Sequence, residues 1–330
     1  MKDHRGHGSR DLSPWQETAR AFSTAVESGR VDLPLPGSGA TLERLSALAD
    51  LAGEDLSLAR LGEGHADAIA ILAELGGPSP QPGSRWGVWA ANPPGPNVTA
   101  EPCGGGTWVL RGTKQYCSGA RICTHALVTA AAADGQRLFA VRVAELQPRD
   151  GTWPATGMAG SDTLDVGFPW VVADPVGPPD CYTERPGFSH GGVGVAACWY
   201  GGARGVARAL LGAATKRDVG PHALAHLGAV DIGLRTAWAA LATAAREIDA
   251  DPEDLRGDGP LRALRVRALT EAVATDVLAR TGRALGAAPL GHDEAHSRAV
   301  ADLTVYLRQH HAERDLARLG ELIAECGAGW

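Results

Sequence analysis

The chain has 330 residues, a formal net charge of −7 and a pI near 5.9. This length is sufficient for a sizeable hydrophobic core or for two to three cooperating units. The acidic balance argues against a nucleic-acid partner or an anionic membrane, because both attract a basic surface. The sequence contains neither a run of 18 uncharged apolar residues nor the apolar segment of a signal peptide. We therefore expect a cytoplasmic protein without a membrane span.

Six cysteines occur in the chain, and none of them forms a CxxC pair or another metal-ligand spacing. Free cytosolic thiols are the simplest explanation. We accordingly expect no metal site.

Residues 13–78 have the pattern of a short helical domain. Apolar side chains recur near the 3.6-residue period, and the sequence Gly76-Gly77-Pro78 is a strong helix stop signal. The predicted helices cover residues 14–29, 41–51 and 56–75.

Residues 79–186 have a different texture, in which short runs of Val, Leu, Trp and Thr are separated by Gly and Pro. This spacing predicts an antiparallel β domain, either a barrel or a sandwich. The predicted strands cover residues 86–91, 107–117, 126–132, 137–143 and 163–172.

Residues 187–330 return to helical periodicity, with longer segments and short connections. The predicted helices cover residues 191–216, 222–250, 259–285 and 292–324. Such an arrangement predicts an antiparallel four-helix bundle. The whole chain is thus predicted to be an α+β protein with a helical domain, a β domain and a C-terminal bundle.

The segment VLRGTKQYCSGA, residues 109–120, is the first candidate for a ligand site. On a regular strand Tyr116 and Ser118 would share one face, with Cys117 between them on the other. A flat ring beside a hydroxyl group suits a flat heterocycle with polar edges. The same spacing also occurs on ordinary half-buried strands, so the residues alone leave both interpretations open.

This segment resembles the middle-domain motif of acyl-CoA dehydrogenases, in which a G-x-K strand precedes Trp-Ile-Thr-Asn along the flavin ring. Gly112 and Lys114 match the strand. Tyr116 takes the place of the Trp, and Ser118 takes that of the Thr. The run WPATGMAGSDTLDVGFPWVVADP, residues 153–175, is similar to the second middle-domain strand pair of that family. The order of the three predicted domains is also the family's order.

The resemblance implies FAD as the cofactor, with its isoalloxazine ring against Tyr116, Cys117 and Ser118. Ala91 begins the loop that corresponds to the family's T-E-P-x-A-G-S-D, but the Thr, Ser and Asp of that loop are missing here. A normal fatty acyl-CoA substrate is therefore not expected.

Two further positions are implied to hold the cofactor. Arg217 matches the Arg of the family's R-x-F-G, which contacts the pyrophosphate, and a guanidinium group suits phosphate oxygens. Without the resemblance, a cation at a negative helix C-terminus would be the preferred explanation. Gly286 resembles a turn that holds the FAD of a neighbouring subunit. The C-terminal bundle of the family normally builds dimers or tetramers, so the resemblance implies a homodimer or homotetramer.

The family removes a substrate α-proton with a Glu near the last helix. Gln309 occupies the matching position, and an amide is not a base in the working pH range. His310 or His311 could take that role near neutral pH. Glu313 lies four residues from Gln309, on the same face of a predicted helix. The sequence QHHAERD is equally typical of a solvated helix surface.

We therefore expect an FAD-dependent oxidoreductase of the acyl-CoA dehydrogenase type, acting on a small molecule or on a carrier-bound acyl group such as an acyl-thioester. A flavin-dependent monooxygenase of the same fold is the first alternative, favoured by the missing carboxylate base. A non-catalytic relative that serves as an interaction or assembly module is the second, favoured by loss of both the base and the phosphate-binding loop.

Overall fold

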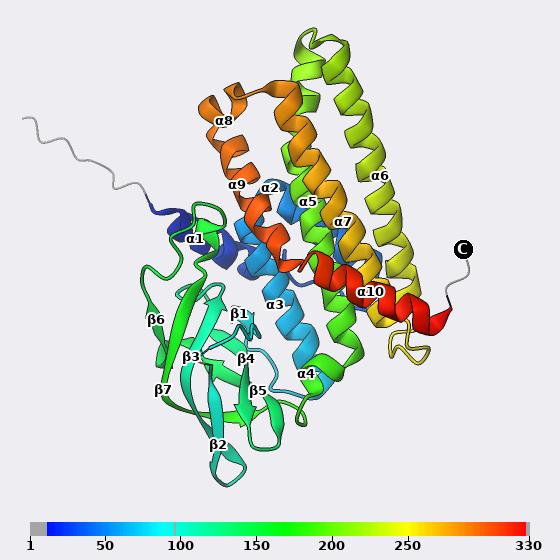
Figure 1. Cartoon of the computed structure of the whole chain (residues 1–330). Helices are drawn as coiled ribbons and strands as arrows, with labels where there is room; N and C mark the ends of the chain where they lie inside the picture. The colour runs from blue at the N-terminus through cyan, green and yellow to red at the C-terminus, as the bar shows by residue number, and fades with distance from the viewer. Residues whose placement is uncertain (1–11, 96, 328–330) are drawn as a thin grey trace, which may run out of the picture.

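The computed structural model describes residues 12–95 and 97–327 and places a β-barrel beside a stack of long helices (Figure 1). The helices α1 (Pro14–Glu27), α2 (Thr41–Glu54) and α3 (Leu56–Leu75) precede the barrel. All three predicted helices are confirmed. Asp55 fixes the start of α3, because its side chain accepts a hydrogen bond from Leu58 N (2.8 Å), and Gly76 ends it in the left-handed conformation.

The strands of the β domain are β1 (Trp86–Trp89), β2 (Thr99–Gly104), β3 (Thr107–Cys117), β4 (His125–Ala132), β5 (Gly135–Arg142), β6 (Gln147–Arg149) and β7 (Leu164–Pro175). The order β4-β2-β3-β7-β5 closes on itself through the β4–β5 pairing, so five strands form the barrel. Strand β1 adds to it at β4, and β6 adds at β7.

Two details of the β domain differ from the prediction. Strand β1 runs parallel to β4, and β2 meets β4 in parallel at one pair, whereas the sequence predicts an antiparallel domain throughout. Strands β2 and β6 were not predicted. Strand β2 carries Pro102 and is exposed along most of its length, and β6 has three residues, so neither shows the apolar alternation that identifies a strand.

The C-terminal part begins with α4 (Cys181–Glu184) and continues through α5 (Pro186–Lys216), α6 (Gly220–Ala250), α7 (Gly259–Leu285), α8 (Ala288–His292), α9 (Glu294–Tyr306) and α10 (Glu313–Cys326). Helices α5, α6 and α7 confirm three of the predicted long helices. The prediction of one helix over residues 292–324 is wrong, because α9, a 3-10 turn (Leu307–Gln309) and α10 share that range. In Figure 1, α10 crosses α7 instead of running alongside it.

Side chains that bind backbone amides interrupt this last segment. The Nδ1 atom of His310 accepts a hydrogen bond from Ala312 N (3.2 Å), and Asp315 accepts one from His311 N (3.0 Å). Ala312 itself has a φ of +49°. These amides are bound by side chains instead of helical carbonyl groups, so the chain turns before α10 begins.

Helix α5 is in direct backbone contact with α2. A Cβ atom at Gly201 would lie 2.1 Å from the carbonyl oxygen of Ala49, and one at Gly205 would lie 3.3 Å from that of Gly53. The neighbouring helix α3 packs between α5 and β1, so it connects the barrel with the long helices (Figure 1). Within the described residues, no helix is both long and apolar enough to cross a bilayer.

The α2–α5 contact predicts a sharp difference between two glycines of one helix. Gly201→Ala should lower the free energy of unfolding by about 2 kcal/mol, because the new methyl group forces two backbones apart. Gly212→Ala should be neutral or stabilising by up to about 1 kcal/mol, since a Cβ there meets nothing within 4 Å and Ala favours the helix. Urea unfolding of the two variants tests this, and equal effects would contradict it.

Candidate functional site

The segment around Tyr116 ends strand β3 with a break in its alternation. Tyr116 has a φ of +59°, and the register with β7 shifts between Lys114 and Cys117. Ser118 already lies beyond the strand. The prediction that Tyr116 and Ser118 share a regular strand face is therefore wrong. The break turns the Tyr116 ring outward, where it is 53% exposed and meets Trp153 edge to face at 6.4 Å between ring centroids.

Cys117 points into the core instead of toward this surface. Its thiol is buried and donates a hydrogen bond to Lys114 O (3.3 Å). Burial raises the pKa of Cys117 well above its usual value. The thiol is therefore protonated, and any contact of Cys117 with a cofactor would come from its backbone.

Ser118 belongs to a chain of hydroxyl groups. Its Oγ atom lies 2.9 Å from Thr163 Oγ1, which in turn lies 2.8 Å from Ser161 Oγ. Ser161 donates to the carbonyl oxygen of Met158 (2.7 Å). A hydroxyl group has one proton to donate, so Thr163 donates to Ser161 and Ser118 donates to Thr163. The lone pairs of half-buried Ser118 remain free to accept a hydrogen bond from a ligand.

The loop before Met158 is anchored to the long helices. Asp302 of α9 accepts a hydrogen bond from Met158 N (2.5 Å), and a Cβ at Gly157 would lie 2.4 Å from Ala301 O. Burial raises the pKa of Asp302 to about 6.

The loop that starts near Ala91 is held from inside the barrel. Ala91 is half-buried just after β1. The buried Lys114 ammonium donates to Asn92 Oδ1 (2.9 Å), Asn97 Oδ1 (3.2 Å) and the Thr129 carbonyl (2.8 Å). Burial lowers the pKa of Lys114 to about 8. One lysine therefore fixes the amides of both Asn92 and Asn97, and by the resemblance Asn97 takes the place of the Ser in the family's loop.

Arg217 and Gly286 end two of the long helices. Arg217 is the exposed C-cap of α5, and Gly286 is the C-cap of α7 with a φ of +68°. The C-terminal ends of α5 and α7 lie at the end of the helices that points away from the barrel (Figure 1). The flavin contacts of both residues stay predictions.

The four residues proposed for the base position do not share one helical face. Gln309 ends the 3-10 turn, and its exposed side chain is separated from Glu313, the exposed first residue of α10, by the break described above. The prediction of a common face for Gln309 and Glu313 is therefore wrong. His311 is exposed, with Nδ1 3.3 Å from Asp315 Oδ1. His310 alone is buried.

The surroundings of His310 determine its hydrogen-bonding role. Because Nδ1 accepts from Ala312 N, the neutral ring carries its proton on Nε2. Burial lowers the pKa of His310, which favours this neutral form. Nε2 is buried without a hydrogen-bond partner in the described part of the chain, and Asp315 Oδ2 is 4.0 Å away. At Nε2 the ring thus offers a donor, not the lone pair of a base.

Trp199 of α5 joins this group and was not among the predicted site residues. Its ring meets His310 edge to face at 6.4 Å, and the Arg267 guanidinium lies 4.6 Å from its ring centroid. Its Nε1 is also buried without a partner in the described residues. Arg267 donates to Gln309 O (3.0 Å) and so ties α7 to the turn. The one sequence feature that could have indicated Trp199 as a site residue is a tryptophan shortly before two glycines, in the run ACWYGG.

A small cavity of about 10 Å³ adjoins Ser118. Its lining residues are Arg60, Leu61, Gly64, Trp86, Gly87, Val88, Ser118 and Cys123. Such a volume is about that of one water molecule. The charged member is Arg60, whose Nη1 lies 2.5 Å from Glu63 Oε2 on the same helix. A flavin ring does not fit this cavity and would have to lie on the exposed side of Tyr116.

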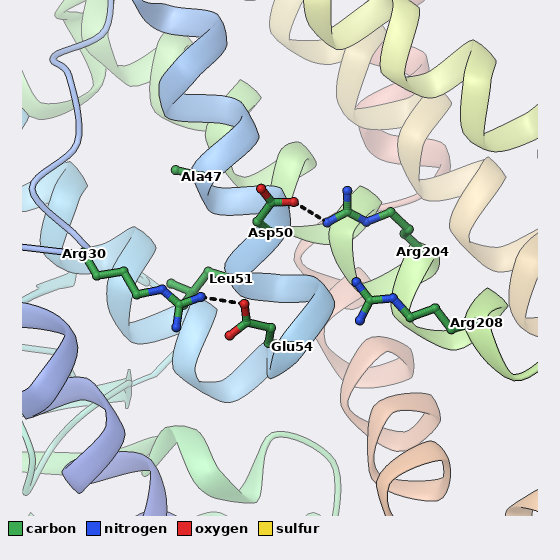
Figure 2. Close-up of a pocket in the computed structure, with 7 residues that line it drawn as sticks. All are labelled: Arg30, Ala47, Asp50, Leu51, Glu54, Arg204 and Arg208. Carbon is green, nitrogen blue, oxygen red and sulfur yellow. Dashed lines mark hydrogen bonds and ion pairs between the residues drawn. The ribbon is translucent and has the colours of Figure 1, made fainter. Parts of the chain in front are cut away.

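A larger cavity of about 360 Å³ lies between α2 and α5 (Figure 2). Its lining residues are Arg30, Ala47, Asp50, Leu51, Glu54, Arg204 and Arg208. Arg204 and Arg208 donate to the carbonyl groups of Ala49 (3.2 Å) and Gly53 (2.7 Å). These arginines therefore cap the C-terminal end of α2, which explains their clustering without a ligand.

Neither a family model nor a curated protein sequence matches the chain. Solved structures do. The dibenzothiophene monooxygenase TdsC from Paenibacillus sp. A11-2, in complex with FMN and indole, is 18% identical, with a TM-score of 0.74 over 93% of this chain and 95% of that one. A nitrososynthase from Micromonospora carbonacea var. africana is 20% identical, with a TM-score of 0.74 over 94% and 90%. The 3-HSA hydroxylase from Rhodococcus sp. RHA1 is 17% identical, with a TM-score of 0.75 over 96% and 92%.

These similarities establish a shared fold. The mixed helical and β architecture is consistent with the predicted acyl-CoA dehydrogenase-like fold. The domain limits 13–78, 79–186 and 187–330 stay predictions.

The residues around Tyr116 fit a flavin. An outward-facing aromatic ring offers a surface for a flat heterocycle, and Ser118 has lone pairs free for an N–H group of a ligand. Tyr116 is the second-last residue of β3, and Ser118 is the first residue after it.

Asp302 predicts a specific dependence of stability on pH. Its pKa in the folded protein is about 6, above its ordinary value of 3.8. The carboxyl group therefore stabilises the fold fully below about pH 4, and this contribution is lost as the pH rises through 6. The difference in unfolding free energy between the wild type and Asp302→Asn should fall by about 2 kcal/mol between pH 4 and pH 7.5. Urea unfolding at both pH values measures it. The exposed Asp231→Asn is the control, and a constant difference for Asp302→Asn would contradict the prediction.

Proposed function

We propose that this chain is a flavin-dependent monooxygenase that transfers an oxygen atom from O₂ to a small-molecule substrate. The observation that carries the proposal is the buried Nε2–H group of His310, which has no hydrogen-bond partner among the described residues and lies at the place predicted for the base. A dehydrogenase of the expected type requires a carboxylate base there, and the matching residue is an exposed Gln309. The names of the structurally similar proteins, a monooxygenase, a nitrososynthase and a hydroxylase, support the same choice.

Each side of the site has a distinct task in this proposal. A reduced flavin, when bound, supplies the electrons that activate O₂. Tyr116 provides a surface for the flavin ring, and Ser118 accepts a hydrogen bond from its edge. The Nε2–H of His310 and the Nε1–H of Trp199 donate to an oxygen or nitrogen atom of the substrate and hold it in place.

We propose FMN as the cofactor, because TdsC is described in complex with FMN. The FAD expected from sequence stays an alternative, and Arg217 would matter mainly for that larger cofactor. A homo-oligomer is also proposed. Ile232 and Leu224, eight residues apart on α6, are 69% and 52% exposed and offer an apolar contact surface. An acyl-thioester substrate stays a prediction of the dehydrogenase alternative.

Cofactor binding and reaction type can be tested with one preparation. The purified protein, incubated with excess FMN or FAD and desalted, should retain the visible bands of FMN. After reduction and exposure to ¹⁸O₂ with indole as the probe, mass spectrometry should find ¹⁸O in the product. Anaerobic bleaching of the oxidised flavin by butyryl-CoA would instead favour the dehydrogenase. A protein that retains no flavin would favour the interaction module.

His310 should be distinguishable from its neighbour. His310→Phe keeps a ring against Trp199 but removes the donor, so the turnover of the oxygenation reaction should fall by about 100-fold or more. FMN affinity should be unchanged, because the histidine is assigned to the substrate. His311→Phe is the matched control at an exposed position, and its turnover should stay near the wild-type value. Equal turnover in both variants would remove His310 from the site.

A further inference from the structure

We infer that Thr163, Ser161 and Asp302 are positioning residues that hold the Ser118 hydroxyl as a hydrogen-bond acceptor toward the bound flavin. This inference rests on the proposed flavin site and adds how that site distinguishes the two redox states of its cofactor. None of the three residues needs to touch the flavin. Their effect is transmitted through the proton order of the hydroxyl chain.

The row of hydroxyl groups from Ser118 through Thr163 to Ser161 has only one order of donors and acceptors in which every hydrogen bond is made. It ends at the carbonyl oxygen of Met158, which can only accept, so Ser161 donates its proton there (2.7 Å). Thr163 must then donate to Ser161 (2.8 Å), and Ser118 must donate to Thr163 (2.9 Å). Ser118 therefore has no proton left for a ligand, although its oxygen still has free lone pairs.

The end of the hydroxyl row at Met158 and Ser161 is held in place from two directions. Asp302 accepts from Met158 N (2.5 Å), and Met158 has a φ of +58°, a conformation that the loop retains only when its surroundings hold it. On the barrel side, Gly119 N donates to Ser161 O (2.8 Å). The carbonyl that sets the proton order is thus held by α9, and the hydroxyl groups are held by the segment that contains Ser118.

The charge of Asp302 is not required for this anchor. Arg298 on the same helix and Asp55 at the start of α3 are the charged groups that act on its carboxyl group, and Glu17 of α1 lies 3.9 Å from Arg298. An asparagine would still accept the hydrogen bond from Met158 N. Asp302→Asn should therefore preserve the proton order, whereas Asp302→Ala should release it.

A fixed acceptor at Ser118 favours one redox state of a flavin. The inference places the N5 edge of the flavin ring at Ser118. Reduced flavin has an N–H group at N5, whereas oxidised flavin has a lone pair there and needs a donor. With the row of hydroxyl groups intact, the site should bind reduced flavin more tightly than oxidised flavin. Without Thr163 Oγ1, the Ser118 hydroxyl is free to rotate and donate, and the preference should weaken.

The test compares dissociation constants of oxidised and reduced FMN, the latter measured anaerobically. Thr163→Val should lower the ratio of the oxidised to the reduced constant by about three- to tenfold, the effect of one hydrogen bond. Thr163→Ser retains the hydroxyl and should restore the wild-type ratio. Thr304→Val, which removes an exposed hydroxyl bonded within α9, is the matched control and should leave it unchanged.

A double-mutant cycle shows whether the effect passes through Ser118. In a Ser118→Ala background, Thr163→Val should no longer change the ratio. Asp302→Ala should lower the ratio, and Asp302→Asn should not. If the wild type binds FMN but Thr163→Val leaves the ratio unchanged, the inference is overturned and the flavin site stands. If the wild type binds neither FMN nor FAD, the inference and the proposed function both fail.

Discussion

The hydrogen bond between Asp302 and the amide of Met158 is the link on which the arrangement of the site depends. It joins residues 144 positions apart and connects the long helices to the loop that leads into β7. A buried carboxyl group is costly unless it is bonded or protonated. The buried carboxyl group of Asp302 is useful here because the loop needs a partner outside itself. Met158 is in the left-handed conformation and Gly157 lies close to α9, and both features require a contact from α9 that holds the loop.

Much of the fold could be predicted from the sequence because its helices follow local rules. The bounds of α3 and α7 agree with the prediction, since Gly76 and Gly286 end them where their sequences predict. The division of the last helix could not be predicted. It depends on the His310 and Asp315 side chains replacing helical carbonyl groups, and helical periodicity carries no information about that competition.

The site was predictable only in part, and for a physical reason. The segment from Tyr116 to Ser118 was recognised by its residue types. Its geometry depends on a positive φ at Tyr116, which no rule for a regular strand anticipates at a tyrosine. Trp199 was missed because it acts through a contact with His310, 111 residues later in the chain, and nothing in the local sequence indicates which side chains will meet.

Helix α3 gives the site a rigid divider between the barrel and the long helices. It packs against β1 on one side and α5 on the other, and its Arg60 and Glu63 form a buried pair beside the water-sized cavity at Ser118. Both charges belong to α3, so the pair itself does not tie the helix to the barrel. The backbone amide of Trp86 in β1 donates a buried hydrogen bond to Nδ1 of His65 in α3 (3.2 Å). This hydrogen bond fixes the register of α3 against β1. The proposed flavin surface at Tyr116 and the donors at His310 and Trp199 belong to the two parts that α3 joins, so this register also determines how these groups lie relative to each other.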